Sequence, residues 1–197
     1  MTSKTFKIEH KGDWSGMELD CLFSDELIQK RVLELGQQIS HDYVGAEKPP
    51  IMIGVLNGSL FFMADLMRAI DIEVEMDFIK IASYHRAEST GTVRLIKDIS
   101  AQITGRDIII VEDIIDSGLS MNFLRRRMLG NEPSSLRVAT FLYKKEVSKL
   151  QEEPDYVGFV IPNRYVIGYG LDLEQQYRQL RAIYAFRDED LEKIKEK

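Results

Sequence analysis

The amino-acid sequence predicts an α/β domain whose mainly parallel central sheet is flanked by helices. Two short, continuous apolar runs, residues 51–56 and 107–111, are each followed by a turn and then by a helical pattern of apolar residues. Strands and helices that alternate at these lengths favour a parallel sheet covered on both faces. The chain of 197 residues, 44% of them hydrophobic, is long enough to bury a substantial core as a single domain.

The expected elements follow one another in a regular order. Strands are expected at residues 51–56, 74–81, 107–111, 136–143 and 156–161, and helices at residues 59–70 and 121–129. The first helix carries Phe62, Leu66 and Ile70 on one face, at spacings of four. The second helix is expected to end at Gly130.

The remaining segments lie outside this core, which spans about residues 46–161. Residues 1–45 and 162–197 are expected to pack over the core as a small hood. Residues 83–94 are polar and lack a helical or strand period, although they lie between two core strands. Loops of this length are functional lids or disordered connections, and both alternatives stay open for this one.

Composition and charge exclude several classes of protein. The net charge of −6 argues against broad nucleic-acid binding, and no apolar stretch approaches the roughly 18 residues of a membrane span. Cys21 is the only cysteine and the N-terminus has no signal-peptide pattern, which together favour the cytoplasm. The three histidines lie far apart in the sequence, without the spacing of zinc ligands.

The segment VEDIIDSGLS, residues 111–120, contains a turn suited to a phosphate group. Ser117, Gly118 and Ser120 lead into the helix that begins near Leu119. Backbone N–H groups at a helix N-terminus, together with serine hydroxyls, can hold a phosphate monoester without a cationic side chain. Gly118 allows the turn conformations that a residue with a Cβ atom resists.

The same segment carries three carboxylates, Glu112, Asp113 and Asp116, which must serve another part of the ligand. Ionised carboxylates accept hydrogen bonds, so a pair of them matches the vicinal hydroxyls of a sugar. Carboxylates also hold Mg²⁺ when phosphates share the metal ion. Glu112 and Asp113 stand at the carboxyl end of the strand at 107–111, where parallel sheets bind ligands, but as strand neighbours they diverge unless the chain turns there.

These observations predict a 5-phosphorylated ribose that carries a further, metal-bound phosphate group. The alternative is that the acids only solubilise a strand end and the serines cap a helix. The complete string IIIVEDIIDSGLS is more specific, because it resembles the phosphoribosyl-diphosphate (PRPP) signature of type I phosphoribosyltransferases. Its Glu-Asp-Ile-Ile-Asp form is that of the 6-oxopurine members, the hypoxanthine-guanine phosphoribosyltransferases.

The resemblance extends from about residue 53 to residue 180 and implies both a fold and an activity. The implied fold is that of type I phosphoribosyltransferases. The implied enzyme is a Mg²⁺-dependent transferase of purine salvage, which converts hypoxanthine or guanine and PRPP to IMP or GMP and pyrophosphate. The resemblance also implies a homodimer or homotetramer. The net charge and the lack of a long apolar stretch predict no nucleic-acid or membrane partner.

The resemblance assigns the PRPP site residue by residue. Glu112 and Asp113 would bind the ribose hydroxyls, and Asp116 would accept the proton from purine N7 as the catalytic base. The ribose and its 5-phosphate would be bound by Glu112, Asp113, Asp116, Ser117, Gly118, Leu119 and Ser120.

The pyrophosphate site would include Asn57, Gly58, Ser83, Tyr84 and Arg178. The segment at 54–66, GVLNGSLFFMADL, is similar to the family's first loop, where backbone amides next to a cis peptide meet pyrophosphate. Asn57 stands where the family commonly has lysine or arginine, so the resemblance carries over the backbone role alone. Ser83 and Tyr84 match the Ser-Tyr pair of a mobile loop that closes over the site.

The purine site would include Lys144, Tyr165, Val166 and Asp172. Lys144 would donate to the 6-oxo group, Tyr165 would stack on the base and Val166 would contact it through its backbone. Asp172 would be a direct metal ligand, with Glu112 and Asp113 as further metal-binding carboxylates.

Each of these residues also has a structural alternative. Lys144 could be a solvated lysine after a strand, and Tyr165 a core aromatic residue. Asp172 could be an acid at a helix N-terminus, and Arg178 a surface partner of Glu174.

Two other functions stay open beside the leading one. One is an RNA-binding regulator on the same fold, for which the arginine run at 125–127 is the only support, although such runs are more often solvated helix faces. The other is a xanthine-preferring enzyme of the same class. The sequence does not rank hypoxanthine against guanine, because both carry the 6-oxo group.

Overall fold

The computed structural model describes residues 4–9, 14–84, 92–187 and 190. Its large sheet has six strands in the order β5-β4-β3-β6-β7-β8. These strands are β3 (Ile51–Leu56), β4 (Glu75–Tyr84), β5 (Thr92–Lys97), β6 (Asp107–Ile115), β7 (Ser135–Tyr143) and β8 (Tyr156–Val160). All neighbours pair in parallel except β4 and β5, so the predicted α/β fold with a mainly parallel sheet is confirmed.

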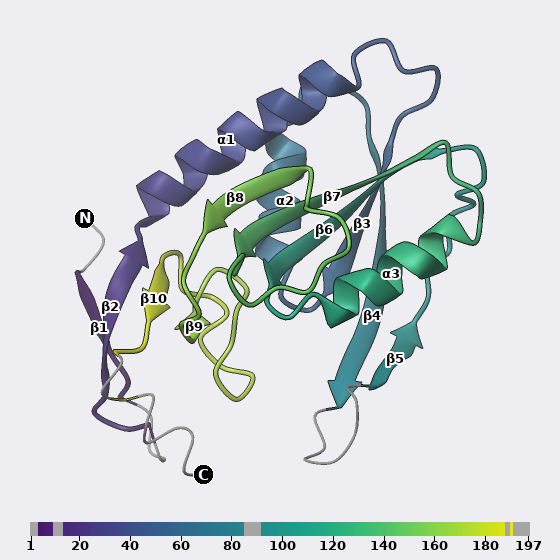
Figure 1. Ribbon diagram of the computed structural model, residues 1–197. Coiled ribbons are helices and arrows are strands. Elements are labelled where there is room, and N and C mark those ends of the chain that lie inside the picture. Colours follow the sequence, from purple (N-terminus) through teal and green to yellow (C-terminus); the bar gives the residue numbers. More distant parts are fainter. Residues whose placement is uncertain (1–3, 10–13, 85–91, 188–189, 191–197) are drawn as a thin grey trace.

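Helices cover both faces of the large sheet (Figure 1). Helices α1 (Asp25–Asp42) and α2 (Leu60–Ala69) pack on one face, and α3 (Leu119–Leu129) packs on the other. Side chains alternate along each strand, so Met52 of β3 faces α1 and α2 while Ile51 and Ile53 face α3. This two-sided burial explains why β3 and β6 are continuous apolar runs in the sequence.

A second, antiparallel sheet is built from the two ends of the chain. It contains β1 (Thr5–Lys7), β2 (Glu18–Phe23), β9 (Val166–Ile167) and β10 (Ile183–Ala185), in the order β1-β2-β10-β9. Its strands gather at one end of the molecule (Figure 1), around a separate apolar cluster that includes Leu19 and Phe186. The sequence predicts a hood from all of residues 1–45, but α1 packs against the large sheet through Ile28, Val32 and Leu35, because these residues form an apolar face.

Two strands differ from their expected bounds. The strand expected at 107–111 continues to Ile115, because β7 runs beside it and pairs with Glu112 and Ile114. The acidic pair therefore lies within β6, and no turn separates it from the strand. Strand β5 was not predicted, because its sequence, TVRLIK, has only partial apolar alternation. Residues 85–91, on which the lid alternative depends, lie outside the described residues.

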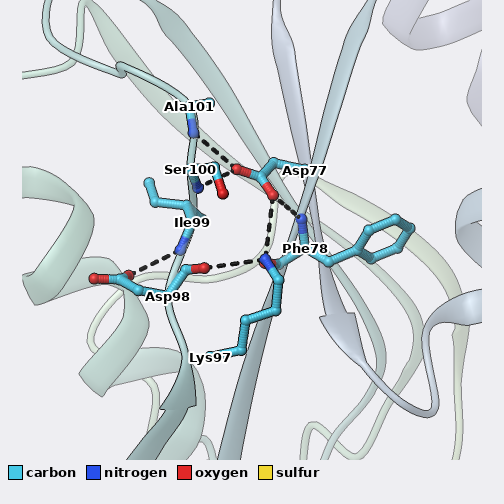
Figure 2. Close-up of polar contacts among 7 residues, drawn as sticks. All are labelled: Asp77, Phe78, Lys97, Asp98, Ile99, Ser100 and Ala101. Carbon is cyan, nitrogen blue, oxygen red and sulfur yellow. Dashed lines mark hydrogen bonds and ion pairs between the residues drawn. The ribbon is translucent and has the colours of Figure 1, made fainter.

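Asp77 of β4 ties the segment after β5 to the sheet (Figure 2). Its carboxylate accepts hydrogen bonds from the backbone nitrogens of Phe78, Ser100 and Ala101 at 2.6, 2.5 and 2.8 Å. The Lys97 Nζ atom lies 3.4 Å from Asp77 Oδ1 and also donates to the backbone oxygen of Phe78. Although burial opposes ionisation, these donors hold the pKa of Asp77 below its usual value. We call Asp77, Lys97, Ser100 and Ala101 the Asp77 cluster.

None of the helices in the described ranges combines the length and apolar character needed to cross a membrane.

Candidate functional site

The predicted site residues come from loops and strand ends at the carboxyl edge of the large sheet. Asn57 and Gly58 follow β3, Glu112 to Ser120 extend from β6 into α3, and Lys144 follows β7. Tyr165 lies between β8 and β9, and Asp172 and Arg178 lie between β9 and β10 of the small sheet. An open parallel sheet places such segments side by side, which is why ligands bind at this edge.

The turn before α3 adopts the conformation that the sequence predicts. Gly118 has φ +79° and begins the helix, and a Cβ atom there would lie 2.9 Å from the side chain of Leu150. The backbone oxygen of Ser117 accepts a hydrogen bond from Lys149 N at 3.0 Å, which fixes the turn from outside. Glycine is therefore required both by the backbone angle and by the space.

A cavity of about 150 Å³ opens on this turn. It is lined by Val93 of β5, by Glu112, and by residues 114–121. The start of α3 and Ser117 line this cavity, and the Ser117 hydroxyl accepts a hydrogen bond from Leu119 N at 3.5 Å. The N-terminus of a helix is suited to bind an anion such as a phosphate group. The structure thus brings the turn and one of the buried carboxylates to the same cavity.

Glu112 and Asp113 form a carboxylate pair without a salt bridge among the described residues. Glu112 is only 8% exposed, and its burial and the charge of Asp113 raise its pKa well above the usual value. Burial also raises the pKa of Asp113, although hydrogen bonds from Glu112 and from Ile114 N oppose that shift. The positive charge of Arg178 offsets the burial of Asp113 only in part, and burial makes both acids costly to ionise. Hydroxyl donors or a cation from a ligand would therefore stabilise their charged forms.

The loop after β3 touches this pair. The peptide bond between Leu56 and Asn57 is cis, as the resemblance implies for the first loop. A Cβ atom on Gly58 would lie 1.6 Å from Asp113 Oδ2, and a Cβ atom on Gly170 would lie 1.9 Å from the oxygen of Gly58. Three segments that are distant in the sequence therefore meet here, with the Asp113 carboxylate packed against Gly58 and Gly170 packed against the oxygen of Gly58.

Arg178 and Asp172 are held against this loop. Arg178 Nη1 donates to the oxygen of Gly170 at 2.7 Å, and Nη2 lies 2.6 Å from Asp172 Oδ1. The other carboxylate oxygen of Asp172 accepts from Gln175 N at 2.8 Å. The alternatives for both residues are wrong, because Asp172 lies in an irregular loop rather than at a helix N-terminus and Arg178 pairs with Asp172 rather than with Glu174.

Lys144 is buried beside the turn at residues 117–120, which we call the phosphate-type turn. Its alternative as a solvated lysine is therefore also wrong. Only 7% of the residue is exposed, and its Nζ atom lies 2.9 Å from Asp116 Oδ2 and 3.2 Å from Asn163 Oδ1. The backbone of Lys144 is fixed by a hydrogen bond to the oxygen of Ile115 at 2.9 Å. Asn163 was not predicted, although it lies only two residues before Tyr165 in the sequence.

Tyr165 lies across the same region and is 40% exposed, so it is not a core aromatic residue. Its ring meets Phe186 edge to face, with 5.4 Å between the ring centroids, and its hydroxyl donates to the backbone oxygen of Asp172 at 3.1 Å. Val166 is buried and pairs with Ala185 in the small sheet. The remaining predicted residues, Ser83 and Tyr84, end β4, where they pair with Val93 and Thr92.

The donor chemistry of the site fits a magnesium ion. Within the described ranges, the chain offers no cluster of three or more histidine, cysteine, aspartate or glutamate residues that could hold a metal by itself. Glu112, Asp113 and Asp172 are oxygen donors, and Mg²⁺ is commonly held by one or two carboxylates together with substrate phosphates and water. These carboxylates thus suit a magnesium ion whose remaining oxygen ligands come from a phosphorylated ligand and water.

Comparison with known proteins shows similarity over most of the chain. Residues 20–174 match the model of the phosphoribosyl transferase domain. The hypoxanthine-guanine phosphoribosyltransferase of Streptococcus pyogenes serotype M3 is 43% identical over 169 residues, which cover 85% of this chain and 93% of that relative. The enzyme of the same description from Mycobacterium tuberculosis is 43% identical over 167 residues, covering 82% and 83% of the two chains.

Solved structures give the same result. A hypoxanthine-guanine phosphoribosyltransferase from Bacillus anthracis, with a HEPES molecule in its active site, is 43% identical, with a TM-score of 0.80 over 85% of this chain and 98% of that chain. The hypoxanthine phosphoribosyltransferase of Trypanosoma cruzi is 38% identical, with a TM-score of 0.77 over 85% and 95% of the two chains.

Proposed function

The chain belongs to the phosphoribosyl transferase family, and we propose that it makes IMP or GMP and pyrophosphate from PRPP and hypoxanthine or guanine, a reaction of purine salvage. Relatives with 43% identity over most of the chain carry the hypoxanthine-guanine description, which supports this substrate class. The observation that carries the proposal is the cavity bordered at once by the phosphate-type turn, Glu112 and Asp116, whose carboxylate pairs with the buried Lys144.

PRPP would occupy the cavity with its 5-phosphate on the turn. The backbone N–H groups of Ser117, Gly118, Leu119 and Ser120, aided by the serine hydroxyls, would bind the phosphate. Glu112 and Asp113 would accept hydrogen bonds from the ribose hydroxyls, and Asp116 would border the sugar. These donors would offset the burial that raises the pKa of Glu112 and Asp113.

The purine would lie between Tyr165 and the Lys144–Asp116 pair. Lys144 would donate to the 6-oxo oxygen, Tyr165 would stack on the base and Val166 would contact it through its backbone, with Asp172 beside them. Purine N9 would then form the bond to C1 of the ribose as the bond from C1 to the pyrophosphate oxygen breaks. The proton on N7 would pass to Asp116, and the bond electrons would leave with pyrophosphate.

Pyrophosphate would be bound by the segments that meet at Gly58. Asn57 and Gly58 would contribute backbone groups, Arg178 a guanidinium, and Ser83 and Tyr84 the end of β4. Asp172, Glu112 and Asp113 would hold Mg²⁺, which neutralises the charge of the pyrophosphate group when bound. Substrate alignment and exclusion of water would protect the electron-poor ribose carbon from hydrolysis.

Two further properties are part of the proposal. The enzyme would act as a homodimer or homotetramer, because its family does so commonly. It would act in the cytoplasm, which a single cysteine, Cys21, suits.

The RNA-binding alternative loses its main support, because the arginine run is largely engaged in ion pairs. Arg125 is 8% exposed and lies 2.5 Å from Glu152, and Arg127 pairs with Asp98.

The experiment that tests the proposal is a steady-state assay with PRPP and five bases: hypoxanthine, guanine, xanthine, adenine and uracil. We expect turnover of hypoxanthine and guanine, because Lys144 offers a donor to their 6-oxo group. Turnover of adenine or uracil without hypoxanthine would overturn the base assignment. A preference for xanthine over both expected bases would favour the xanthine enzyme.

A further inference from the structure

We propose that Asn163 is a positioning residue, which directs the Lys144 ammonium toward the 6-oxo group of the base and so sets the affinity for 6-oxopurines. The proposal rests on the function proposed above and deepens it. It starts from a polar contact of Lys144 to a residue that the sequence did not assign to the site, the 3.2 Å hydrogen bond to Asn163 Oδ1.

A buried ammonium group needs an acceptor for each of its three donors. Among the described residues, Lys144 Nζ has two acceptors, Asp116 Oδ2 at 2.9 Å and Asn163 Oδ1 at 3.2 Å. The lysine is 7% exposed, so solvent does little to satisfy the remaining donor. The carbonyl oxygen of a bound base can accept a hydrogen bond from this third N–H group.

The identity of the Asn163 contact is decided by chemistry. An ammonium group carries donors only, so the amide of Asn163 must present its oxygen rather than its nitrogen to Lys144. An amide oxygen has no net charge, whereas the carboxylate of Asp116 attracts the ammonium strongly. Asn163, an exposed residue, therefore offers a second acceptor to the ammonium and adds no second negative charge.

The two acceptors come from different parts of the fold. Asp116 lies at the end of β6, and Asn163 follows β8. The segment that carries Asn163 is fixed by the hydrogen bond from Ile161 N to the oxygen of Tyr143 at 2.9 Å, next to Lys144 in the chain. The ammonium is thus held between two anchored segments, with its third donor directed away from both.

Loss of Asn163 would leave Asp116 as the only acceptor of the Lys144 ammonium among the described residues. The ammonium would then move toward Asp116, away from the 6-oxo position, and would cover carboxylate oxygen that the proposed mechanism uses for the N7 proton. The first effect weakens binding of the base. The ribose and phosphate parts of the site contain no contact to Asn163 among the described residues, so PRPP binding should be spared.

The test compares Asn163→Ala, which removes the acceptor, with Asn163→Asp, which keeps an oxygen at the same position. Gln102→Ala removes an exposed amide outside the site and is the matched control. We expect Asn163→Ala to raise the KM for hypoxanthine about tenfold, the scale of a lost hydrogen bond to a charged group, with the KM for PRPP within about twofold of wild type. Asn163→Asp should restore the KM for hypoxanthine to within about threefold.

A second measurement does not depend on turnover. IMP binding to the full-length chain, measured by titration calorimetry, should weaken by a similar factor in Asn163→Ala and recover in Asn163→Asp. If Asn163→Ala does not fold, Asn163→Ser, which keeps a small polar side chain, takes its place in both measurements.

The outcomes separate this proposal from the proposed function. A wild-type protein that turns over no 6-oxopurine would refute the proposed function. A wild-type protein that is active, with the same KM for hypoxanthine in Asn163→Ala, would overturn the role of Asn163 alone. An equal loss in Asn163→Ala and Asn163→Asp, or an equal rise in the KM for both substrates, would overturn it too, because a merely structural role predicts those results.

Discussion

Carboxylates on β4 and β6 of the large sheet, which flank β3, have opposite surroundings. Asp77 of β4 accepts hydrogen bonds from three backbone N–H groups and pairs with Lys97, which keeps its pKa low. Glu112 of β6 is buried beside the partly buried Asp113, neither has a salt bridge among the described residues, and both of their pKa values are raised. The carboxylate on β4 thus has hydrogen-bond donors and a salt bridge that stabilise its charge, whereas the two carboxylates on β6 have no salt bridge among the described residues.

The difference indicates what each group does. Buried polar groups in folded proteins are normally satisfied, so a satisfied carboxylate such as Asp77 indicates a role in the fold. A pair of adjacent acids whose pKa values stay raised beside a cavity indicates a role in binding a ligand. Asp116 lies between these cases, because its side chain is 56% exposed and it has a single cationic partner, Lys144.

The largest expected effect concerns Asp116. Asp116→Asn should lower kcat by roughly 10² to 10⁴, because an amide cannot accept the N7 proton, while the KM for PRPP stays close to wild type. Steady-state kinetics with hypoxanthine measure both quantities, and Glu146→Gln, a nearby exposed acid, serves as the control. A collapse of PRPP affinity with unchanged turnover would show that Asp116 belongs with the binding pair and is not the base.

The next largest effect tests whether Glu112 and Asp113 bind PRPP or stabilise the fold. Glu112→Gln combined with Asp113→Asn should raise the KM for PRPP by at least about tenfold, because charged acceptors of hydrogen bonds are replaced by neutral amides. The ligand-free Tm should stay the same or rise, because the mutual repulsion of the two carboxylates is removed. Thermal unfolding in the absence of ligand measures the second quantity. A Tm that falls while PRPP affinity is retained would place the pair with Asp77 as a structural group.

The parts of the fold that follow local patterns were predictable from sequence. Apolar runs mark β3 and β7 because both faces of these strands are buried, and apolar residues at helical spacing mark α2. The Ser-Gly-x-Ser turn was also predictable, since a helix N-terminus and a glycine with positive φ depend on adjacent residues only. Family similarity is confirmed by the comparisons, whereas the roles of single site residues stay predictions.

The parts that sequence did not predict depend on contacts between distant segments. The extension of β6 past residue 111 requires β7 beside it, and the edge strand β5 is defined by its pairing with β4. Asn163 reaches Lys144 only because β8 lies next to β7. The Arg178–Asp172 pair depends on an irregular loop in which Glu174 and Gln175 have positive φ, which no periodic pattern indicates.

A smaller effect is expected for the Asp77 cluster. Asp77→Ala would leave three backbone donors without their acceptor, at a cost of roughly 1–3 kcal/mol in the free energy of unfolding. For a chain of this size each kcal/mol lowers the Tm by about 2–4 °C. The kcat/KM of the folded enzyme should be unchanged, and Asp77→Asn, which keeps one acceptor oxygen, should lose less stability. An activity loss with a normal Tm would contradict the contrast between the two carboxylate groups.

The smallest effect is a pair of opposite pH dependences in the ligand-free protein. The folded pKa of Asp77 is lowered, so its contribution to stability is present above its unfolded value near 3.8 and is lost as pH falls through the folded pKa. The pKa of Glu112 is raised, so the native state binds more protons than the unfolded chain above about 4.5, and stability falls as pH rises through the folded pKa.

Denaturant titrations of the wild type, Asp77→Asn and the Glu112→Gln/Asp113→Asn double variant across the acid and neutral range separate these contributions. The double variant should lose less stability than wild type as pH rises above 4.5, because amides do not titrate there. The free energy of unfolding of Asp77→Asn should instead decline less than that of wild type as pH falls below about 3.8, and its pH dependence in the neutral range should match wild type. If the free energy of unfolding of the double variant and of the wild type changes with pH in parallel above 4.5, the charge of the acidic pair does not destabilise the fold. The physical reason to infer that the pair binds a ligand is then removed.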